Sequence, residues 1–242
     1  MPVKRITNTQ PQAPGTATAQ RPTAQGTPPA SQPPTGNNFP QMTQSDIRAM
    51  LAAQKQLSTP ASRQAVKDYV NPAQQSNGYG ISQNLNHAMS YGQQLTPKQQ
   101  AIKDGLQSIM VPIGVETTLH RADHDSVLKA LGINNYQQLT GAQLKKQLVG
   151  RTITTKEFWS TSHDPSKNPF LPGGIQGGGR EVHLIIHTSK TTRGALIQSS
   201  QAEILLDAGT NVRVTGVRYT GQTAYPRVGG AKKVVEIEVE VW

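Results

Sequence analysis

The stretch Phe158-Trp159-Ser160-Thr161-Ser162 places an apolar pair before three small hydroxyl residues, and His163-Asp164-Pro165 follows it. Phe, Trp and Thr favour a pleated surface and proline interrupts it, so this stretch is predicted to be a short strand that ends at Pro165. Side chains alternate along a strand, which puts the two serines on one face and Trp159 and Thr161 on the other. Alone, the serines would be ordinary residues of an exposed edge strand. An arginine upstream and a glutamate downstream change that interpretation.

Helical patterns dominate the chain before Gly150 and strand patterns dominate it afterwards. Two helix starts carry capping boxes, Thr96-Pro97-Lys98-Gln99 and Thr140-Gly141-Ala142-Gln143. Strands are predicted at residues 115–120, 151–155, 158–162, 181–187, 203–206, 211–219 and 234–242, with a long loop over 165–180 and a polar loop over 191–202. Helices followed by a run of strands indicate an α+β fold rather than a wound parallel sheet.

The first 44 residues differ in composition from the rest of the chain. They contain no Asp or Glu and nine of the 17 prolines, with few large apolar residues. Such a segment cannot bury enough surface to offset its chain entropy, so we expect a disordered Pro/Gln/Thr-rich tail that acts as a delivery segment or a simple spacer. Residues 45–79 are predicted to form a helical linker or an N-terminal extension, and residues 80–242 the folded domain.

Charge and composition exclude several classes of protein. The formal charge is +10, from 24 basic and 14 acidic residues, but the basic residues are scattered and do not alternate with aromatics. This pattern favours a solvated basic surface, and we expect no nucleic-acid partner. No run reaches the ~18 apolar residues of a membrane span. Cysteine is absent, which excludes a disulfide framework, and the first residues lack the apolar core of a cleavable signal peptide.

Two other groups of polar residues were considered as sites. Glu236, Glu238 and Glu240 alternate with apolar residues, which predicts a solvated strand face rather than a catalytic pair. The histidines show no spacing typical of metal ligands. We therefore expect no metal.

Three polar residues stand in positions where chemistry is plausible. Arg121 ends the predicted strand 115–120, Ser160 lies on the next short strand, and Glu203 opens a later strand after a flexible loop. An arginine suits a diphosphate because it forms bidentate charge-assisted hydrogen bonds. A carboxylate can hold a ribose hydroxyl and stabilise an oxocarbenium-like charge at an anomeric carbon.

The order of these motifs resembles that of a known family. Leu119-His120-Arg121-Ala122, then residues 158–162, then Gln201-Ala202-Glu203-Ile204-Leu205-Leu206 resemble the Arg, Ser-Thr-Ser and Gln-x-Glu signature of the mono-ADP-ribosyltransferase toxins and effectors. The flanks agree, since Leu95-Thr96-Pro97-Lys98-Gln99-Gln100 resembles the helix before the catalytic arginine. The resemblance covers residues 80 to 242. It implies a split β-sandwich of two small sheets with an N-terminal helical layer, which binds NAD+ between the sheets.

The resemblance implies a role for each matching residue. Arg121 would bind the phosphates of NAD+ and the nicotinamide-side ribose, and the main chain of Ala122 would meet the nicotinamide amide. Ser160 would orient the catalytic Glu203, which would bond the ribose 2′-hydroxyl as the glycosidic bond breaks. The implied NAD-binding residues are Arg121, Ala122, Ser160, Thr161, Ser162, Phe170 and Arg180. Phe170 would stack and Arg180 would bind phosphate.

Gln201 would face the acceptor, two residues before the catalytic glutamate. In the family, Glu at this place accompanies arginine acceptors and Gln accompanies others, such as asparagine. A neutral amide cannot take a proton from a guanidinium but can hydrogen-bond an amide, so we expect an acceptor other than arginine. The loop of residues 194–200 lacks the aromatic residue often found there, which leaves acceptor docking open.

The sequence thus predicts an NAD+-dependent mono-ADP-ribosyltransferase that modifies a host protein and acts as a monomer. We expect an effector or toxin that is secreted, or a protein that a phage carries into a host. Two alternatives remain, an NAD glycohydrolase that uses water as the acceptor and an inactive basic binding module of the same fold.

Overall fold

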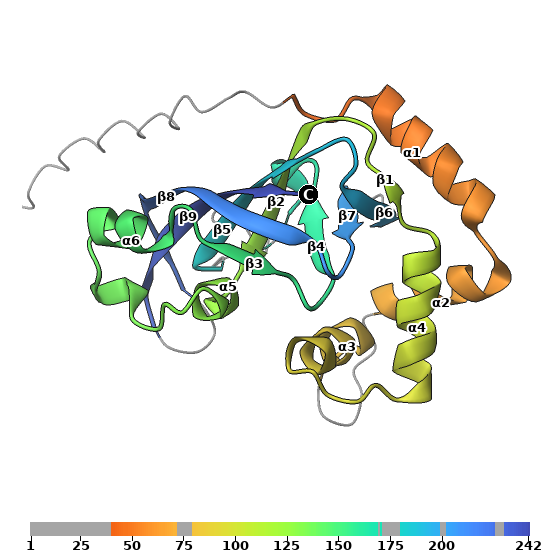
Figure 1. Ribbon diagram of the computed structural model, residues 1–242, viewed down its shortest axis with the longest axis horizontal. Coiled ribbons are helices and arrows are strands. Elements are labelled where there is room, and N and C mark those ends of the chain that lie inside the picture. The colour runs from red at the N-terminus through yellow and green to blue at the C-terminus, as the bar shows by residue number, and fades with distance from the viewer. Residues whose placement is uncertain (1–39, 72–78, 169, 171–179, 199–201, 226–229) are drawn as a thin grey trace, which may run out of the picture. The chain divides into compact units, whose positions relative to one another are not determined.

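The computed structural model describes residues 40–71, 79–168, 170, 180–198, 202–225 and 230–242, and in them six α-helices accompany a nine-stranded sheet (Figure 1). The chain divides into two compact units, and the described residues all lie in the second, Thr35–Trp242. The first unit, Met1–Pro34, lies outside the described residues. The predicted disordered tail therefore stays a prediction up to residue 39.

The element order matches an α+β protein. The helices are α1 (Gln44–Leu57), α2 (Pro60–Val70), α3 (Ile81–Ser90), α4 (Pro97–Ser108), α5 (Ser126–Ala130) and α6 (Gly141–Leu148). The strands are β1 (Val111–Pro112), β2 (Thr117–Asp123), β3 (Thr152–Thr154), β4 (Trp159–Ser162), β5 (Val182–Thr188), β6 (Arg193–Gln198), β7 (Glu203–Leu206), β8 (Asn211–Ala224) and β9 (Lys232–Val241). Short 3₁₀ turns cover Tyr136–Gln138 and Pro165–Lys167.

Both predicted capping boxes are present. The Thr96 side chain accepts a hydrogen bond from the Gln99 amide at 3.2 Å, and the Gln99 side chain accepts one from the Thr96 amide at 2.9 Å. Thr140 and Gln143 repeat this exchange at the start of α6. These reciprocal bonds satisfy amides that the first turn of a helix leaves unpaired, and the two helices begin where the sequence predicted.

The nine strands run in the order β1-β6-β7-β4-β2-β5-β9-β8-β3. The order is weakest between β4 and β2, which register at one pair, His120 opposite Ser162. This pair divides the sheet into a first group of strands, β1-β6-β7-β4, and a second group, β2-β5-β9-β8-β3. The apolar faces of both groups contribute to one hydrophobic core. Trp159 and Ile204 enter that core from the first group, and Leu184 and Ile237 enter it from the second. The predicted split α+β sandwich is confirmed, with its two halves joined at this single pair.

A second core lies on the other face of the first strand group. Tyr69, Leu85 and Leu106, from α2, α3 and α4, pack there against strand-side residues that include Phe158 and Leu205. These three helices form the N-terminal helical layer, which is visible beside β4, β6 and β7 in Figure 1. This layer and the parting strands β2 and β4 together frame the site described below.

Strand β6 corrects the sequence prediction, which placed a polar loop over residues 191–202. Ala195 is fully buried in the second core, Leu196 packs on the first, and Ile197 packs on the second. A strand that is apolar on both faces shows no polar alternation, which is why its pattern was missed.

The glutamates of β9 correct a second prediction. Glu236 is only 6% exposed, although a solvated strand face was predicted. It lies in register between His183 on β5 and Arg218 on β8, and its carboxylate is 2.5 Å from Nε of Arg218. Opposite charges in cross-strand register allow a carboxylate to be buried. Glu238 and Glu240 are partly exposed.

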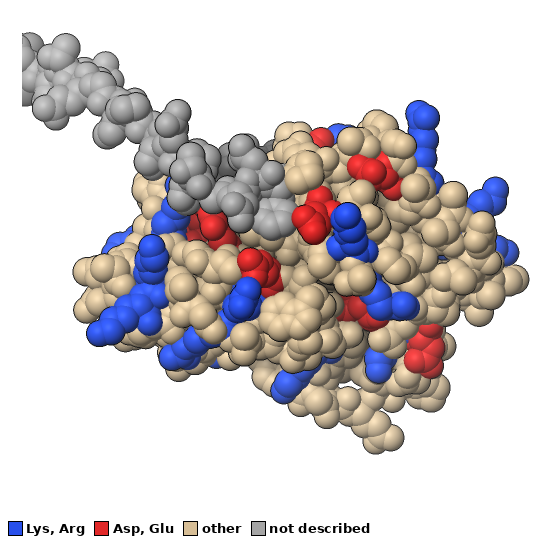
Figure 2. Space-filling model, turned by 45° about the horizontal axis from the view of Figure 1, so that its top comes forward, with Lys and Arg blue, Asp and Glu red and all other residues tan. Residues whose placement is uncertain are grey.

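Charged residues are mixed over the visible surface. On the face in Figure 2, Lys and Arg side chains lie among Asp and Glu side chains rather than in one stripe. None of the described helices has the length and apolar character that crossing a membrane requires.

Candidate active site

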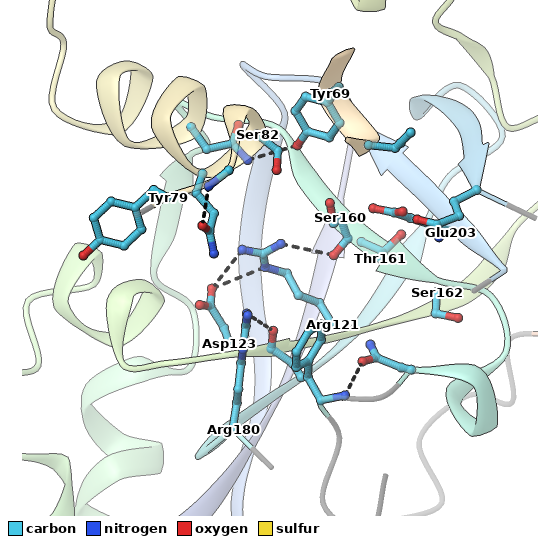
Figure 3. Close-up of a pocket in the computed structure, with 18 of the residues that line it drawn as sticks. Tyr69, Tyr79, Ser82, Arg121, Asp123, Ser160, Thr161, Ser162, Arg180 and Glu203 are labelled. Carbon is cyan, nitrogen blue, oxygen red and sulfur yellow. Dashed lines mark hydrogen bonds and ion pairs between the residues drawn. The ribbon is translucent and has the colours of Figure 1, made fainter. Parts of the chain in front are cut away.

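Arg121, Ser160 and Glu203 meet in one cleft between the helical layer and the sheet (Figure 3). The cleft has a volume of about 900 Å³. The three residues lie on β2, β4 and β7, which are successive strands in the sheet order. Three motifs separated by about 40 residues each therefore form a single row across the sheet.

Arg121 lies where β2 and β4 separate. Beyond the His120–Ser162 pair the ladder stops, and Nη1 of Arg121 donates to the carbonyl oxygen of Ser160 at 3.1 Å. Its Nε and Nη2 donate to Oδ2 of Asp123 at 3.3 and 3.2 Å, and its guanidinium lies 5.6 Å from the centre of the Trp159 ring. The side chain is thus oriented from three sides, which fixes its charge at the cleft.

Glu203 opens β7, opposite Ser162 on β4 and Gln198 on β6. Burial raises the pKa of its carboxyl group, although a hydrogen bond with Ser160 and the charge of Arg121 lower it. The preceding residue, Ala202, has a φ of 51°, a left-handed conformation that is uncommon for alanine. A carboxylate removed from water in this way interacts strongly with a positive charge that develops beside it.

The three hydroxyls of the Ser-Thr-Ser motif have different partners. Thr161 donates to the carbonyl oxygen of Ile204 at 2.6 Å, which ties β4 to β7. Ser162 donates to the carbonyl oxygen of Asp164 at 2.7 Å and so shapes the turn after β4. Ser160 faces Glu203, as Figure 3 shows. All three residues line the cleft, but the bonds of Thr161 and Ser162 hold the strand that presents Ser160.

Phe170 and Arg180 also line the cleft and contact each other. The Arg180 guanidinium lies 4.5 Å from the centre of the Phe170 ring, and the Arg180 amide donates to the Phe170 carbonyl oxygen at 2.9 Å. Nη1 of Arg180 donates to the carbonyl oxygen of Ala122 at 3.1 Å. Burial lowers the pKa of Arg180. The structure therefore brings a second arginine to the main chain beside Arg121.

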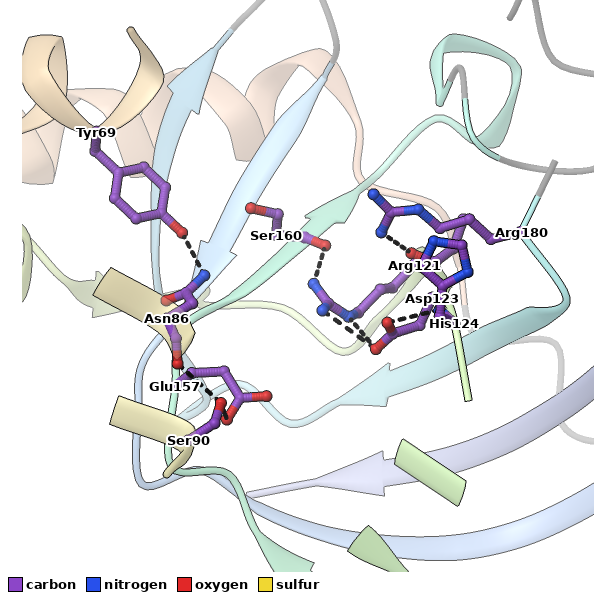
Figure 4. A network of polar contacts seen from close by, with 10 residues as sticks. Tyr69, Asn86, Ser90, Arg121, Asp123, His124, Glu157, Ser160 and Arg180 are labelled. Carbon is purple, nitrogen blue, oxygen red and sulfur yellow. Dashed lines mark hydrogen bonds and ion pairs between the residues drawn. The ribbon is translucent and has the colours of Figure 1, made fainter. Parts of the chain in front are cut away.

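Tyr69 and Asn86 belong to the site although the sequence did not single them out. Nδ2 of Asn86 donates to the Tyr69 hydroxyl at 3.0 Å (Figure 4). The Tyr69 ring meets the Phe158 ring edge to face, with 6.2 Å between the ring centres. Burial raises the pKa of Tyr69 to about 12, although hydrogen bonds with Asn86 and Ser160 lower it. Both residues come from helices α2 and α3, where only tertiary packing reveals their place, so no local signal marked them.

A buried carboxylate supports the far rim of the cleft. Glu181 is 1% exposed, and its two oxygens are 2.9 Å from Nδ1 of His124 and 3.0 Å from Nζ of Lys232. Burial raises the pKa of Glu181, but the bonds from His124, the backbone and Lys232 outweigh it and bring the pKa to about 2. His124 lines the cleft next to Asp123. This ionised carboxylate ties the ends of β2, β5 and β9 together.

The sequence model of the ADP-ribosyltransferase exoenzyme family matches residues 36–238, which is most of the 242-residue chain. The chain belongs to the ADP-ribosyltransferase exoenzyme family. The predicted family and reaction class, an NAD+-dependent mono-ADP-ribosyltransferase of the toxin type, are thereby confirmed. No curated protein sequence matches the chain.

Solved structures of ADP-ribosyltransferases share the fold. Plx2a, an ADP-ribosyltransferase toxin from Paenibacillus larvae, is 15% identical with a TM-score of 0.55, and the match covers 82% of this chain and 95% of Plx2a. C3stau2 from S. aureus, solved with NAD, is 18% identical with a TM-score of 0.54, over 81% and 92% of the two chains. The ADP-ribosylating toxin BECa of C. perfringens, solved with NADH, is 14% identical with a TM-score of 0.56, over 82% of this chain and 48% of BECa.

Most residues predicted for the ADP-ribosyltransferase site converge on the cleft. Arg121, Ala122, Ser160, Thr161, Ser162, Phe170, Arg180 and Glu203 all line it. Gln201 lies outside the described residues, so its predicted place facing the acceptor stays a prediction. Within the described part of the chain, no group of three or more His, Cys, Asp or Glu side chains is arranged to hold a metal ion.

Proposed function

We propose that this ADP-ribosyltransferase binds NAD+ in the cleft and transfers ADP-ribose to a side chain, other than arginine, of a protein in a host cell. The observation that supports this most is the row of Arg121, Ser160 and Glu203 on three successive strands of one cleft. The row would place the diphosphate at Arg121 and the reacting carbon at Glu203.

The two arginines suit the diphosphate. Arg121 and Arg180 converge on the main chain at Ala122, through the bond of Arg180 to its carbonyl oxygen. Asp123 holds one edge of the Arg121 guanidinium, which orients it and partly balances its charge before the substrate enters. Phe170 offers an apolar ring beside Arg180 for a base or the nicotinamide.

Asn86 supplies an unused acceptor in the same cleft. Its Oδ1 atom is buried without a hydrogen-bond partner among the described residues, while its Nδ2 atom is bound to Tyr69. A buried polar atom without a partner is rare in a folded protein and calls for an explanation. A ribose hydroxyl or the nicotinamide amide would satisfy it, which fits an NAD+ site.

Glu203 would act on the bond that breaks. The glycosidic bond between the anomeric carbon and the nicotinamide nitrogen breaks, nicotinamide leaves with both electrons, and the acceptor atom bonds to the carbon and loses a proton. The Glu203 carboxylate, oriented by Ser160, would hold the ribose 2′-hydroxyl and stabilise the oxocarbenium-like charge.

The acceptor would meet amides rather than carboxylates. Gln198 lines the cleft directly opposite Glu203, and the predicted acceptor residue Gln201 lies two positions before that glutamate. The other carboxylate in the described lining, Asp123, is paired with Arg121. Amides hydrogen-bond neutral side chains but do not deprotonate a guanidinium, which disfavours arginine as the target.

The exoenzyme family and the toxin relatives support a role in a host cell. We propose that the protein is a secreted effector or toxin, or is carried into the host by a phage. The Pro/Gln/Thr-rich segment before residue 45 would serve as its delivery or spacer segment.

Labelled NAD+ tests the proposal directly. The wild type and Glu203→Ala are mixed with labelled NAD+ and a host-cell lysate, and protein-bound label and free nicotinamide are both measured. Label on a lysate protein that is lost with Glu203→Ala supports the transferase, and Gln201→Glu then tests whether an arginine acceptor becomes possible. Nicotinamide release without labelled protein would favour a glycohydrolase. Absence of both NAD+ consumption and NAD+ binding would leave an inactive binding module.

A further inference from the structure

Gln54 on α1 completes the outer edge of the sheet with its side chain. Its Nε2 atom donates to the carbonyl oxygen of Leu196 at 3.0 Å, and its Oε1 atom accepts from the Leu196 amide at 3.1 Å. Gln54 is 7% exposed, whereas most of the residues next to it in α1 are exposed. A primary amide has the same donor and acceptor as a peptide unit, so Gln54 pairs with β6 as a residue of another strand would.

The Gln54 side chain takes the place of a neighbouring strand because strand β1 is short. Strand β1 pairs with β6 only at Val111–Gly194 and Pro112–Arg193, and then ends. Helix α1 lies beside β1 and β6 in Figure 1, so the next backbone groups of β6 face the helix. A shielded amide or carbonyl left without a partner is unfavourable, and the side chain of Gln54 pairs both backbone groups of Leu196.

Strand β6 leads from Leu196 to the active site. A bulge follows between Leu196 and Gln198, and Gln198 lies opposite Glu203 and lines the cleft. The row that begins at Arg121 on β2 and passes through β4 and β7 thus continues to β6. Among these four strands, β6 is the one farthest from Arg121. If the diphosphate lies at Arg121 and the reacting carbon at Glu203, the acceptor enters from the β6 side.

We propose that Gln54 is a positioning residue that fixes β6 and, through it, the acceptor side of the active site. The proposal rests on the proposed function, because it assumes that NAD+ lies along this row. The three catalytic residues are on β2, β4 and β7, and the two hydrogen bonds of Gln54 reach none of these strands. Loss of Gln54 should therefore impair transfer to protein more than hydrolysis of NAD+ by water.

Two variants and a matched control separate these effects. Gln54→Glu keeps the size but cannot donate to the Leu196 carbonyl oxygen, and Gln54→Met keeps the length and helix propensity without either bond. Gln56→Glu makes the same charge change at an exposed position of α1. Protein-bound label and released nicotinamide are measured for each, with circular dichroism as the check on folding.

We expect both Gln54 variants to lower the ratio of protein-bound label to released nicotinamide on the order of 10-fold, because a displaced acceptor loses its alignment with the anomeric carbon. Gln56→Glu should leave the ratio unchanged. Equal losses of transfer and hydrolysis in Gln54→Met, or an unchanged ratio in both variants, would overturn the proposal.

Hydrogen exchange at the Leu196 amide tests the contact itself without any turnover. The amide should exchange faster in Gln54→Met than in the wild type and Gln56→Glu, since its acceptor is gone. Equal exchange rates would show that Gln54 does not hold the strand and would overturn the proposal. If the wild type consumed no NAD+, the proposed function would fail, while the exchange rates would still decide whether Gln54 holds β6.

Discussion

At the scale of single residues, Glu203 combines its proposed chemical role with a cost to stability. Burial raises its pKa in the folded chain, so the folded state disfavours the ionised form that the unfolded chain adopts freely. The buried Glu203 thus lowers the free energy of unfolding. This destabilisation is absent at low pH and grows as the pH rises past the pKa that Glu203 has in the unfolded chain. Glu203→Gln should reduce NAD+ turnover on the order of 10²-fold or more and raise the urea midpoint at pH 7. A lower midpoint would contradict this account of the site.

The hydroxyl of Tyr69 is predicted to serve the site rather than the core. Tyr69→Phe keeps the edge-to-face contact with Phe158 but removes the partner of Asn86 and Ser160. The two lost hydrogen bonds are worth about 1 kcal/mol each, so the melting temperature should fall by several degrees. We expect kcat/KM for NAD+ to fall about 10-fold, measured by nicotinamide release. Equal kcat/KM values for the two proteins would remove Tyr69 from the site.

At the scale of elements, the contact between α2 and α4 sets the position of Tyr69. A Cβ atom on Gly105 of α4 would lie 2.5 Å from Cβ of Ala65 on α2, which is far inside van der Waals contact. Gly105→Ala should therefore push α2 outward and cost roughly 1–3 kcal/mol, against about 1 kcal/mol gained in helix propensity. Because Tyr69 lies one turn beyond Ala65, KM for NAD+ should rise as well.

A compensating substitution tests whether the steric overlap between Gly105→Ala and Ala65 causes the loss of stability and the rise in KM. Adding Ala65→Gly to Gly105→Ala returns the same number of methyl groups to the interface with their positions exchanged. KM for NAD+ should then recover toward the wild-type value. A double variant that stays as impaired as Gly105→Ala would show that α2 is not displaced by the overlap.

Glu181 links three strand ends and makes their stability depend on pH. Its pKa is about 2 in the folded chain, below the ordinary value of 4.5, because its hydrogen bonds outweigh its burial. A lowered carboxyl pKa stabilises the fold above the unfolded value, and this contribution is lost as the pH falls from about 4.5 toward 2. Glu181→Gln should cost about 2 kcal/mol in urea unfolding at pH 7. The gap between the two proteins should narrow below pH 4.5, and a constant gap would contradict the assignment.

Local chemistry made some elements predictable and hid others. The capping boxes at Thr96 and Thr140 act within four residues, so sequence alone located the starts of α4 and α6. The row of Arg121, Ser160 and Glu203 followed from motif order. Strand β6 was missed because apolar residues on both its faces pack on a core, and Gln54 was missed because its partner lies 142 positions away. Properties decided by distant contacts leave no periodicity in the sequence.

At the scale of the whole molecule, the helical layer and the sheet form one folded unit. The sequence predicted a catalytic domain beginning at residue 80, with residues 45–79 as a linker or an extension. Helix α2 packs on α4 within the second core and brings Tyr69 to the cleft, and α1 pairs with β6 through Gln54. We therefore propose that the functional domain begins before α1, and the limits of the family match are consistent with this.

Two truncated chains test this boundary. Residues 40–242 keep every described contact, so this chain should match the full-length protein in melting temperature and NAD+ turnover. Residues 80–242 lose α1 and α2, which exposes the apolar faces of Ile102, Leu106 and Phe158 and leaves the Leu196 backbone unpaired. Burial of several such side chains contributes about 1.5–3 kcal/mol each, which is comparable to the whole stability of a domain. The shorter chain should therefore fail to fold cooperatively in circular dichroism. A cooperative transition with undiminished turnover would instead place the boundary at residue 80 and make Tyr69 and Gln54 dispensable.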